Sequence, residues 1–339
     1  MSRMRRSMTF AHRVDRLLQS NTFDVVHAIT PCRGADVYEP RGGTVAESVE
    51  RNLALVRLGA LRSVKRQANR LNLKQQHALR LERALLRGAE GPVVVAISDY
   101  VVRQLKRHYD VPDARIRKIY NGVDPDPTPA DERARHREAI RREFGIAEAD
   151  CLVLSIAHNF RLKGIRQWME ALRLLVSRGV TKVRSLVIGR GDSARWHELA
   201  RRMGIMRHLT FVGPSERIRE FHHAGDVLVH PTFYDPCSRV VLEAMVAGLP
   251  CVTTRWDGAS EMIEDGISGF VLDDPRDITA IADRVDRLGS VELRRRMGGA
   301  ASAVAERVEM VRHAAEMMAV YKEVCEARRA EGRACRAMP

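Results

Sequence analysis

The chain has 339 residues, 45% of them hydrophobic, and a formal net charge of +14 at pH 7. This length suits two domains that each bury a core, and the lack of any run of about 18 apolar residues argues against a membrane-spanning helix. The six scattered cysteines form no C-x-x-C pair, and residues 1–9 lack the apolar stretch of a secretory signal. We therefore expect a cytoplasmic protein with neither a zinc site nor a disulfide framework.

The first 122 residues predict short strands separated by helices. Apolar runs bounded by glycine, proline or asparagine predict strands at residues 23–29, 35–38, 93–97 and 116–119. Apolar positions at helical spacing predict one helix over 9–20, one or two long helices over 46–87, and a helix over 100–109.

Residues 51–87 hold ten lysines and arginines but a single acid, Glu82. A surface of this charge attracts anions. Two interpretations stay open: a solvated helix face, or a surface that rests on anionic lipid or on an anionic acceptor. Nucleic acid is the weaker candidate, because no aromatic side chain lies between Glu50 and Gly88 to stack on bases.

Residues 125–136 are rich in proline, acids and arginine and poor in apolar side chains, so we expect a linker. Beyond them strands alternate with helices, which predicts a parallel, doubly wound sheet. The expected strands cover residues 151–157, 184–188, 209–212, 226–230, 250–254 and 269–272. The expected helices cover 165–178, 194–203, 218–224, 238–247, 278–288 and 303–328, with a short helical turn at 260–264.

One segment carries two acids spaced as D-x7-E, with Asp235 before an expected helix and Glu243 inside it. A carboxylate at Glu243 can accept hydrogen bonds from two ribose hydroxyls, while Asp235 can meet sugar hydroxyls. The first N–H groups of the helix can bind a diphosphate with help from the helix dipole; they belong to Ser238, Arg239 and Val240. Taken alone, such a pair of acids is more often a helix cap and a solvated side chain.

Five motifs in order resemble those of the family-4 retaining glycosyltransferases. The D-x7-E pair resembles their E-x7-E donor signature, with Asp235 in place of the usual first glutamate. The others are Asn121-Gly122-Val123-Asp124, Arg161-Leu162-Lys163-Gly164, Gly189-Arg190-Gly191-Asp192 and Asp257-Gly258-Ala259-Ser260-Glu261. The resemblance implies an α/β fold of GT-B type, in which two Rossmann-like domains face a cleft. The domains would be residues 1–122 and 123–302, with a closing helix over 303–330 that returns toward the first.

The resemblance also implies a nucleoside-diphosphate sugar as donor, with UDP favoured, and no tightly bound cofactor. Lys163 and Arg161 would hold the diphosphate and Asp235 would position the sugar, which makes these three the candidate catalytic residues. The candidate donor-binding residues are Glu243, Gly189, Gly191, Ser238, Arg239, Val240 and Asn159. No D-x-D pair stands where a metal-dependent enzyme would need one, so no metal is expected. Cations and helix N–H groups would then stabilise the leaving nucleoside diphosphate.

The first 122 residues resemble the lipopolysaccharide core glucosyltransferase I group more loosely, through Asp24-Val25-Val26, residues 34–38 and Ile97-Ser98-Asp99. In this part His27, Glu39 and Arg41 are candidate acceptor contacts. A strand, a glycine-rich loop and a helix usually open the fold and are not recognisable here. We therefore expect a truncated N-terminal domain.

The implied function is a hexosyltransferase that moves a hexose, glucose first, to an envelope glycolipid or polysaccharide such as lipopolysaccharide core, with retained anomeric configuration. The implied partners are the donor, the acceptor and an anionic membrane surface, without nucleic acid. The implied location is cytoplasmic, peripheral on the inner face of the membrane. Two alternatives are a catalytically impaired, nucleotide-binding scaffold at a membrane, and a nucleotide-sugar 2-epimerase. The epimerase is disfavoured because those enzymes lack this pairing of Lys-Gly and E-x7-E motifs.

Overall fold

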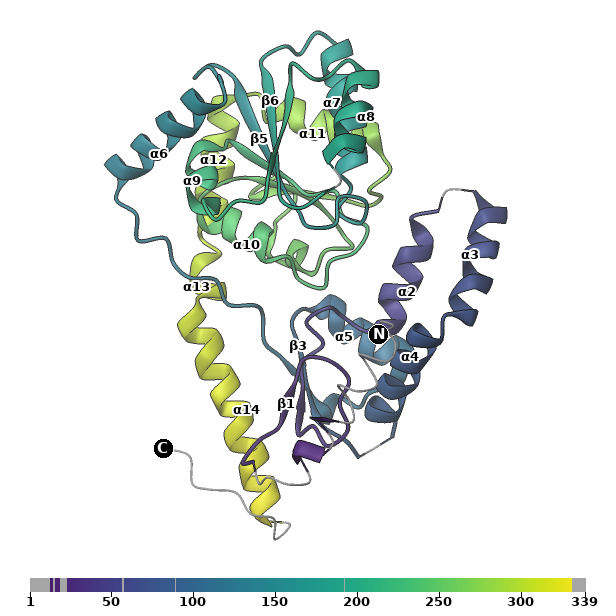
Figure 1. Cartoon of the computed structure of the whole chain (residues 1–339). Coiled ribbons are helices and arrows are strands. Elements are labelled where there is room, and N and C mark those ends of the chain that lie inside the picture. The colour runs from purple at the N-terminus through teal and green to yellow at the C-terminus, as the bar shows by residue number, and fades with distance from the viewer. Residues whose placement is uncertain are drawn as a thin grey trace. The chain divides into compact units, whose positions relative to one another are not determined.

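The computed structural model describes residues 13–14, 16–18, 23–56, 58–88, 90–191 and 193–330 (Figure 1). The expected helix over 9–20 and the basic start over 1–9 therefore lie largely or wholly outside the described residues. The chain divides into two compact units. Unit 1 comprises Met1–Gly122 and Val311–Pro339, and unit 2 comprises Val123–Met310.

Unit 1 contains a four-stranded parallel sheet in the order β1-β2-β3-β4. Its strands are β1 (His27–Ala28), β2 (Val37–Tyr38), β3 (Val93–Ala96) and β4 (Ile116–Lys118). The first strand is shorter than the seven-residue run expected from the sequence. Helix α14 (Met310–Ala330) packs on this sheet, because Met317, Val320 and Val324 form one buried cluster with strand residues Val37 and Val95.

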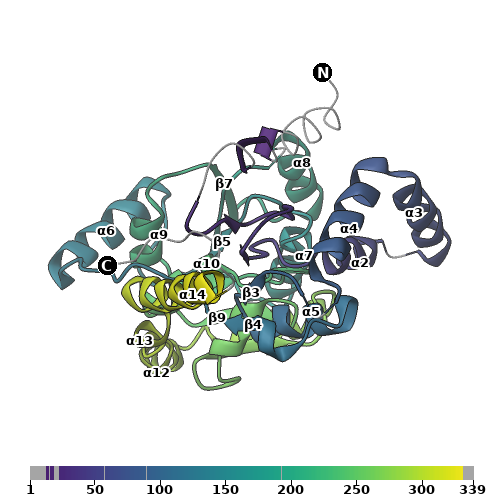
Figure 2. The ribbon, with the colours of Figure 1, turned by 90° about the horizontal axis from the view of Figure 1, so that it is seen from below.

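Three helices occupy the segment for which one or two were expected: α2 (Val45–Ala54), α3 (Gly59–Leu71) and α4 (Leu73–Leu86). The break before α4 has a local cause, because Asn72 is extended and its side chain accepts a hydrogen bond from the backbone of Gln75. In both views α3 lies beyond α2 and α4 from the strands (Figures 1 and 2). Within its described part, unit 1 also contains helix α5 (Asp99–Tyr109) and the 3₁₀ turn η1 (Asp113–Arg115).

Unit 2 contains a six-stranded sheet in the order β10-β9-β8-β5-β6-β7, with every pair parallel. The strands are β5 (Cys151–Ile156), β6 (Val183–Ile188), β7 (Leu209–Gly213), β8 (Val227–Val229), β9 (Cys251–Thr254) and β10 (Gly269–Leu272). The bounds of all six strands agree with the expected bounds within about two residues. Strands that are buried on both faces have nearly continuous apolar sequences, which makes them recognisable. The prediction of a doubly wound parallel sheet is confirmed.

Helices follow the strands of unit 2 and cover both faces of the sheet. They are α7 (Ile165–Ser177), α8 (Ser193–Met203), α9 (Ile218–Ala224), α10 (Arg239–Val246), the 3₁₀ turn η2 (Gly258–Met262), α11 (Ile278–Arg287), α12 (Val291–Ser302) and α13 (Ala305–Val308). The buried indole of Trp168 in α7 donates to Ser185 Oγ at 2.8 Å, so the one polar atom of this core side chain has a partner.

The sequence interpretation of residues 125–136 as a linker was wrong from residue 130 onward, because α6 (Ala130–Glu143) begins there. This helix has almost no apolar periodicity. Ion pairs hold it instead: Arg137 and Arg141 lie 3.2 Å and 2.6 Å from the carboxylate of Asp226. The last helix also differs from expectation, since the expected helix over 303–328 is divided into α13 and α14. None of the described helices is long and apolar enough to cross a membrane.

Candidate functional site

Two loops of unit 2 meet at the carboxyl edge of its sheet, where parallel α/β sheets bind ligands. The first follows β5 and contains Lys163, and the second follows β8 and contains Asp235; β5 and β8 are neighbours in the sheet. The backbone of Phe233 donates to Leu162 O at 2.8 Å. Gly164 has φ +71°, and a Cβ atom there would lie 2.0 Å from the carbonyl oxygen of Pro231. The contact therefore requires glycine after Lys163.

A partly buried ion cluster joins these loops. The Lys163 ammonium pairs with the Asp235 carboxylate and donates to Tyr234 O at 3.1 Å, and His230 Nε2 lies 3.6 Å from the same carboxylate. Burial by itself raises the pKa of Asp235, but Lys163 and His230 outweigh it and hold that pKa well below its usual range. Asp235 is therefore a carboxylate that accepts hydrogen bonds.

A fully buried acid, Asp257, fixes the start of α10. Its Oδ1 accepts from the backbone N–H of Ser238 at 3.0 Å and of Ala259 at 2.9 Å, and its Oδ2 lies 2.9 Å from Thr253 Oγ1. Burial, and then the charge of Asp235, raise the pKa of Asp257 to about 6. Sequence reasoning missed this role. It placed Asp257 in a motif, but nothing in the local pattern shows that its side chain reaches a helix about 19 residues earlier.

His230 was also missed as a site residue. The only available signal was its position at the end of an apolar strand, immediately before Pro231. Its side chain is 3% exposed and lies against Asp235, so it belongs to the ion cluster.

The first turn of α10 keeps N–H groups available. Ser238 caps the helix, because its Oγ accepts from the N–H of Val241 at 3.4 Å, while Asp257 takes the N–H of Ser238 itself. Neither side chain takes the N–H groups of Arg239 and Val240, which are among those that a helix leaves without an intrahelical acceptor. This end of α10 therefore suits an anion.

Glu243 lies one turn further along α10, with its carboxylate 3.4 Å from the Arg239 guanidinium. Burial raises the pKa of Glu243; Arg239 opposes this effect and Asp124 adds to it. The side chain remains 28% exposed and lines a hollow of about 190 Å³ that also contains Asp124, Asp126, Arg219, His222 and Arg239.

Arg161, Asn159 and Gly191 line a second hollow of unit 2, of about 480 Å³, together with His158, Phe160, Arg190 and Trp196. Two glycines permit this shape. A Cβ atom at Gly189 would lie 1.9 Å from Ala157 O, and one at Gly191 would lie 2.4 Å from the Phe160 ring. Asn159 Oδ1 accepts from the backbone of Leu162 at 3.2 Å, which shapes the loop before Lys163. Asp192 of the same motif lies outside the described residues.

The expected donor residues thus gather at one edge of the unit 2 sheet, but not at one point. Lys163 and Asp235 are in contact, and Ser238 is tied to the same loops through Asp257. Arg161 lines one hollow and Glu243 another.

In unit 1, His27, the first residue of β1, comes together with Glu39 and Arg41, which follow β2. Glu39 is fully buried, 3.2 Å from His27 Nε2 and 2.9 Å from Arg41 Nε, and Tyr321 Oη lies 2.7 Å from His27 Nδ1. Burial raises the pKa of Glu39, but hydrogen bonds from His27 and Arg41 outweigh it and lower that pKa. Tyr321 and Glu39 therefore lie next to the two ring nitrogens of His27.

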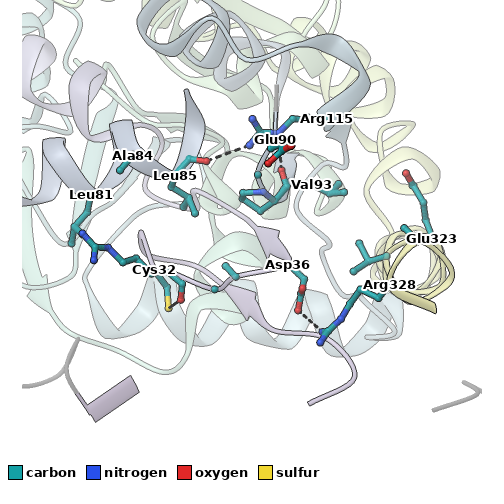
Figure 3. Close-up of a pocket in the computed structure, with 17 residues that line it drawn as sticks. Cys32, Asp36, Leu81, Ala84, Leu85, Glu90, Val93, Arg115, Glu323 and Arg328 are labelled. Atoms are coloured by element: carbon teal, nitrogen blue, oxygen red, sulfur yellow. Dashed lines mark hydrogen bonds and ion pairs between the residues drawn. The ribbon is translucent and has the colours of Figure 1, made fainter. Parts of the chain in front are cut away.

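The opposite, amino edge of the unit 1 sheet has a larger hollow, of about 840 Å³ (Figure 3). Two of the three arginines that line it are bound to other parts of the protein. Arg115 donates to the carbonyl oxygens of Leu85, Leu86, Gly88 and Pro92, and Arg328 pairs with Asp36 at 2.9 Å. No expected site residue lines this hollow.

Among the described residues, one group has the composition and spacing of a metal site: Glu47, Glu50 and His108 in unit 1. Arg107 already neutralises it, because the guanidinium lies 2.8 Å from Glu50 and 3.5 Å from Glu47. The edge of the unit 2 sheet described above is therefore the candidate site for an organic ligand.

Comparison with known proteins assigns the chain to a family. The family model described as Glycosyltransferase Family 4 matches residues 1–127, and the model described as Glycosyl transferases group 1 matches residues 136–304. The lipopolysaccharide glucosyltransferase WaaG of Escherichia coli K12 is 26% identical over 262 residues, which are 77% of this chain and 67% of that protein. For seven further curated relatives, this chain covers between 48% and 61% of the length of the relative.

Solved structures agree on the fold. The crystal structure of WaaG, described as a glycosyltransferase involved in lipopolysaccharide biosynthesis, has a TM-score of 0.79 at 23% identity, with 94% of this chain and 83% of that chain covered. Anabaena Alr3699/HepE in complex with UDP and glucose has a TM-score of 0.69 at 18% identity, with 94% and 80% covered. Because both family models match in order over two parallel-sheet units, the chain belongs to the family-4 glycosyltransferases and is a transferase of GT-B fold.

Proposed function

We propose that this glycosyltransferase moves a hexose, with glucose the first candidate, from a nucleoside-diphosphate sugar to an envelope glycolipid or polysaccharide such as lipopolysaccharide core. UDP is the favoured nucleotide, and the anomeric configuration is retained. The name of the Escherichia coli relative supports the sugar and the acceptor class, and the UDP and glucose held by the Anabaena protein support the donor.

The observation that carries the proposal is the cationic, amide-rich edge of the unit 2 sheet. Lys163 and the free first-turn N–H groups of α10 come from loops that touch each other. In the proposed complex Lys163 and Arg161 neutralise the diphosphate, and the N–H groups of Arg239 and Val240, next to Ser238, bind its oxygens. Charge on the leaving nucleoside diphosphate is stabilised in this way, and the reaction requires no metal.

The remaining donor contacts follow from position. Glu243 accepts from ribose hydroxyls, and ionised Asp235 accepts from sugar hydroxyls. The backbone at Gly189 and Gly191 lies close to neighbouring atoms of the protein, and Asn159 shapes the adjoining loop. This arrangement leaves room for the nucleotide beside Arg161.

On the acceptor side we assign His27, Glu39 and Arg41 as positioning contacts. Arg41 is half exposed while its partner Glu39 is buried, so the guanidinium is held in place and can still meet an acceptor hydroxyl or phosphate. A glycolipid acceptor would place the protein at the inner face of a membrane, in contact with anionic lipid.

Calorimetric titration with UDP tests the donor assignment. Glu243→Ala should weaken UDP binding about tenfold or more, because two hydrogen bonds to a charged group are lost. Exposed Glu292 in α12 provides the matched control, and Glu292→Ala should bind like wild type. Unchanged affinity for Glu243→Ala rejects the assignment. Lys163→Ala and Arg161→Ala should instead slow sugar transfer by about 100-fold, measured against UDP-, GDP- and ADP-sugars.

A further inference from the structure

The hollow beside Glu243 lies between helices α9 and α10. Ile218 and His222 line it from α9, and Arg239, Glu243 and Ala247 line it from α10. Residues four apart lie on one face of a helix, so each helix presents a single face to the hollow. Its volume of about 190 Å³ is well below the roughly 300–1,000 Å³ typical of sites for drug-sized ligands. The hollow therefore suits one small ring better than a whole nucleotide.

His222 brings a polar atom without a partner to this hollow. The residue is 4% exposed, and no described residue forms a hydrogen bond with its Nε2. Folded proteins rarely leave a buried polar atom in this unfavourable state without a ligand or a water beside it. The cations of the hollow are paired instead, because Arg239 lies 3.4 Å from Glu243 and Arg219 lies 3.6 Å from Asp126. The Nε2 atom is therefore a place for a ligand that forms hydrogen bonds.

The charge state of His222 indicates which chemical group it binds. Burial, and then the neighbouring His223, lower the pKa of His222 to about 4, and Asp126 opposes this effect. At neutral pH the ring is therefore uncharged, so it adds no positive charge for a phosphate but can donate one hydrogen bond to a hydroxyl oxygen. Glu243 offers a carboxylate in the same hollow, and a carboxylate only accepts. A hydroxyl between the two side chains can accept from one and donate to the other.

The nucleotide of the proposed donor carries such hydroxyls at the right place along α10. In a nucleoside diphosphate the ribose is bonded directly to the diphosphate. A diphosphate on the N–H groups of Arg239 and Val240 therefore brings the ribose toward the next turn of the helix, where Glu243 and the hollow lie.

We propose that His222 is a further donor-binding residue, whose Nε2–H donates to a ribose hydroxyl that itself donates to Glu243. The inference rests on the proposed function, because the ligand must be a nucleotide. It deepens that function by making the site selective for ribonucleotides, since a site built to bond a hydroxyl rejects the analogue that lacks it.

The test is calorimetric titration of wild type, His222→Phe and His222→Gln with UDP, 2′-deoxy-UDP and 3′-deoxy-UDP at a single pH. Wild type should bind each deoxynucleotide about tenfold or more weakly than UDP. His222→Phe keeps a ring but removes the nitrogen, so it should bind UDP about fivefold more weakly. Its preference for UDP over one of the deoxynucleotides should fall by the same factor, and its other preference should not change. The amide of His222→Gln can replace Nε2, so this variant should bind UDP like wild type.

Phe221→Leu is the matched control. Phe221 is 1% exposed in the same helix and is not among the residues that line the hollow, so this variant should lose stability but bind UDP like wild type. The NMR signals of the histidine ring nitrogens give a second measurement, which does not depend on the folding of His222→Phe. The Nε2 signal that disappears in His222→Gln should shift when UDP is added to wild type.

Two results overturn the inference: unchanged nucleotide preferences in His222→Phe, or a His222 signal that UDP does not shift. The Glu243→Ala titration separates this failure from failure of the proposed function. If Glu243→Ala weakens UDP binding and His222→Phe does not, the donor assignment holds and the role of His222 is wrong. If both variants bind UDP like wild type, the donor assignment fails as well.

Discussion

Asp257→Asn tests the electrostatics beneath the first turn of α10. The Asp257 side chain is buried at 1% exposure, and its pKa rises from 3.8 to about 6 because of burial and the charge of Asp235. Between these two pH values the folded state binds a proton that the unfolded chain has released. The contribution of Asp257 to stability is therefore most favourable below pH 3.8 and is lost as the pH rises through about 6.

The size of the effect follows from the shift. A rise from 3.8 to about 6 is about two pKa units, and one unit corresponds to about 1.4 kcal/mol, so ionised Asp257 destabilises the fold by on the order of 3 kcal/mol above pH 7. Asparagine is neutral and fits the same hydrogen bonds. Thr253 Oγ1 lies 2.9 Å from Asp257 Oδ2 and 3.0 Å from His230 O, so an amide can donate to the hydroxyl while the hydroxyl donates to the carbonyl.

The assay is urea unfolding of wild type and Asp257→Asn from pH 4 to pH 8. The variant should be about 1–3 kcal/mol more stable at pH 8, and the advantage should disappear toward pH 4. Glu243 and Glu82 also have raised pKa values, but they are common to both proteins and cancel in the difference. Asp257→Ala, which leaves two buried N–H groups unpaired, should be less stable at every pH. A difference between wild type and Asp257→Asn that does not change with pH refutes the reasoning.

Two further substitutions test the contact between the loops. In urea unfolding, Gly164→Ala should destabilise the fold by about 2 kcal/mol more than Gly179→Ala. Both glycines have positive φ, but only at Gly164 would the added Cβ lie 2.0 Å from a carbonyl oxygen. Equal losses of stability in the two variants would contradict this explanation. Lys163→Met should cost about 1–3 kcal/mol at pH 7, because it leaves the partly buried Asp235 carboxylate without its main partner. Since the pKa of Asp235 is lowered, its stabilisation exists above pH 3.8 and is lost below it, so the loss should shrink as the pH falls.

The sheet of unit 2 could be predicted from the sequence because five of its six strands are almost wholly buried. Cys151–Ile156 and Val183–Ile188 are nearly continuous apolar runs, and helices with apolar periodicity separate them. Helix α6 could not be predicted in this way. Its sequence resembles a solvated linker, and the partner of its arginines, Asp226, lies 85 residues or more along the chain.

Separation along the sequence also limits how much of the site can be predicted. The sequence supplied Lys163, Asp235 and Glu243 through their motifs, but their contacts depend on strand order. β8 lies beside β5 although two strands separate them in sequence, and this brings Lys163 and Asp235, 72 residues apart, into an ion pair. The roles of His230 and Asp257 follow from the same crossover, which no local pattern contains.

The ion cluster gives Lys163 two competing partners in the proposed reaction. In the structure its ammonium neutralises Asp235, so a diphosphate that takes Lys163 leaves His230 as the remaining described ion-pair partner of Asp235. The negative charge beside Asp257 then increases, and Asp257 also contacts the Ser238 N–H at the mouth of α10, where the diphosphate is proposed to bind. Protonated Asp257 therefore favours the bound state. UDP affinity in wild type should fall as the pH rises through about 6, whereas the Asp257→Asn protein should bind UDP with less dependence on pH. Equal pH dependence in the two proteins would place the diphosphate away from α10.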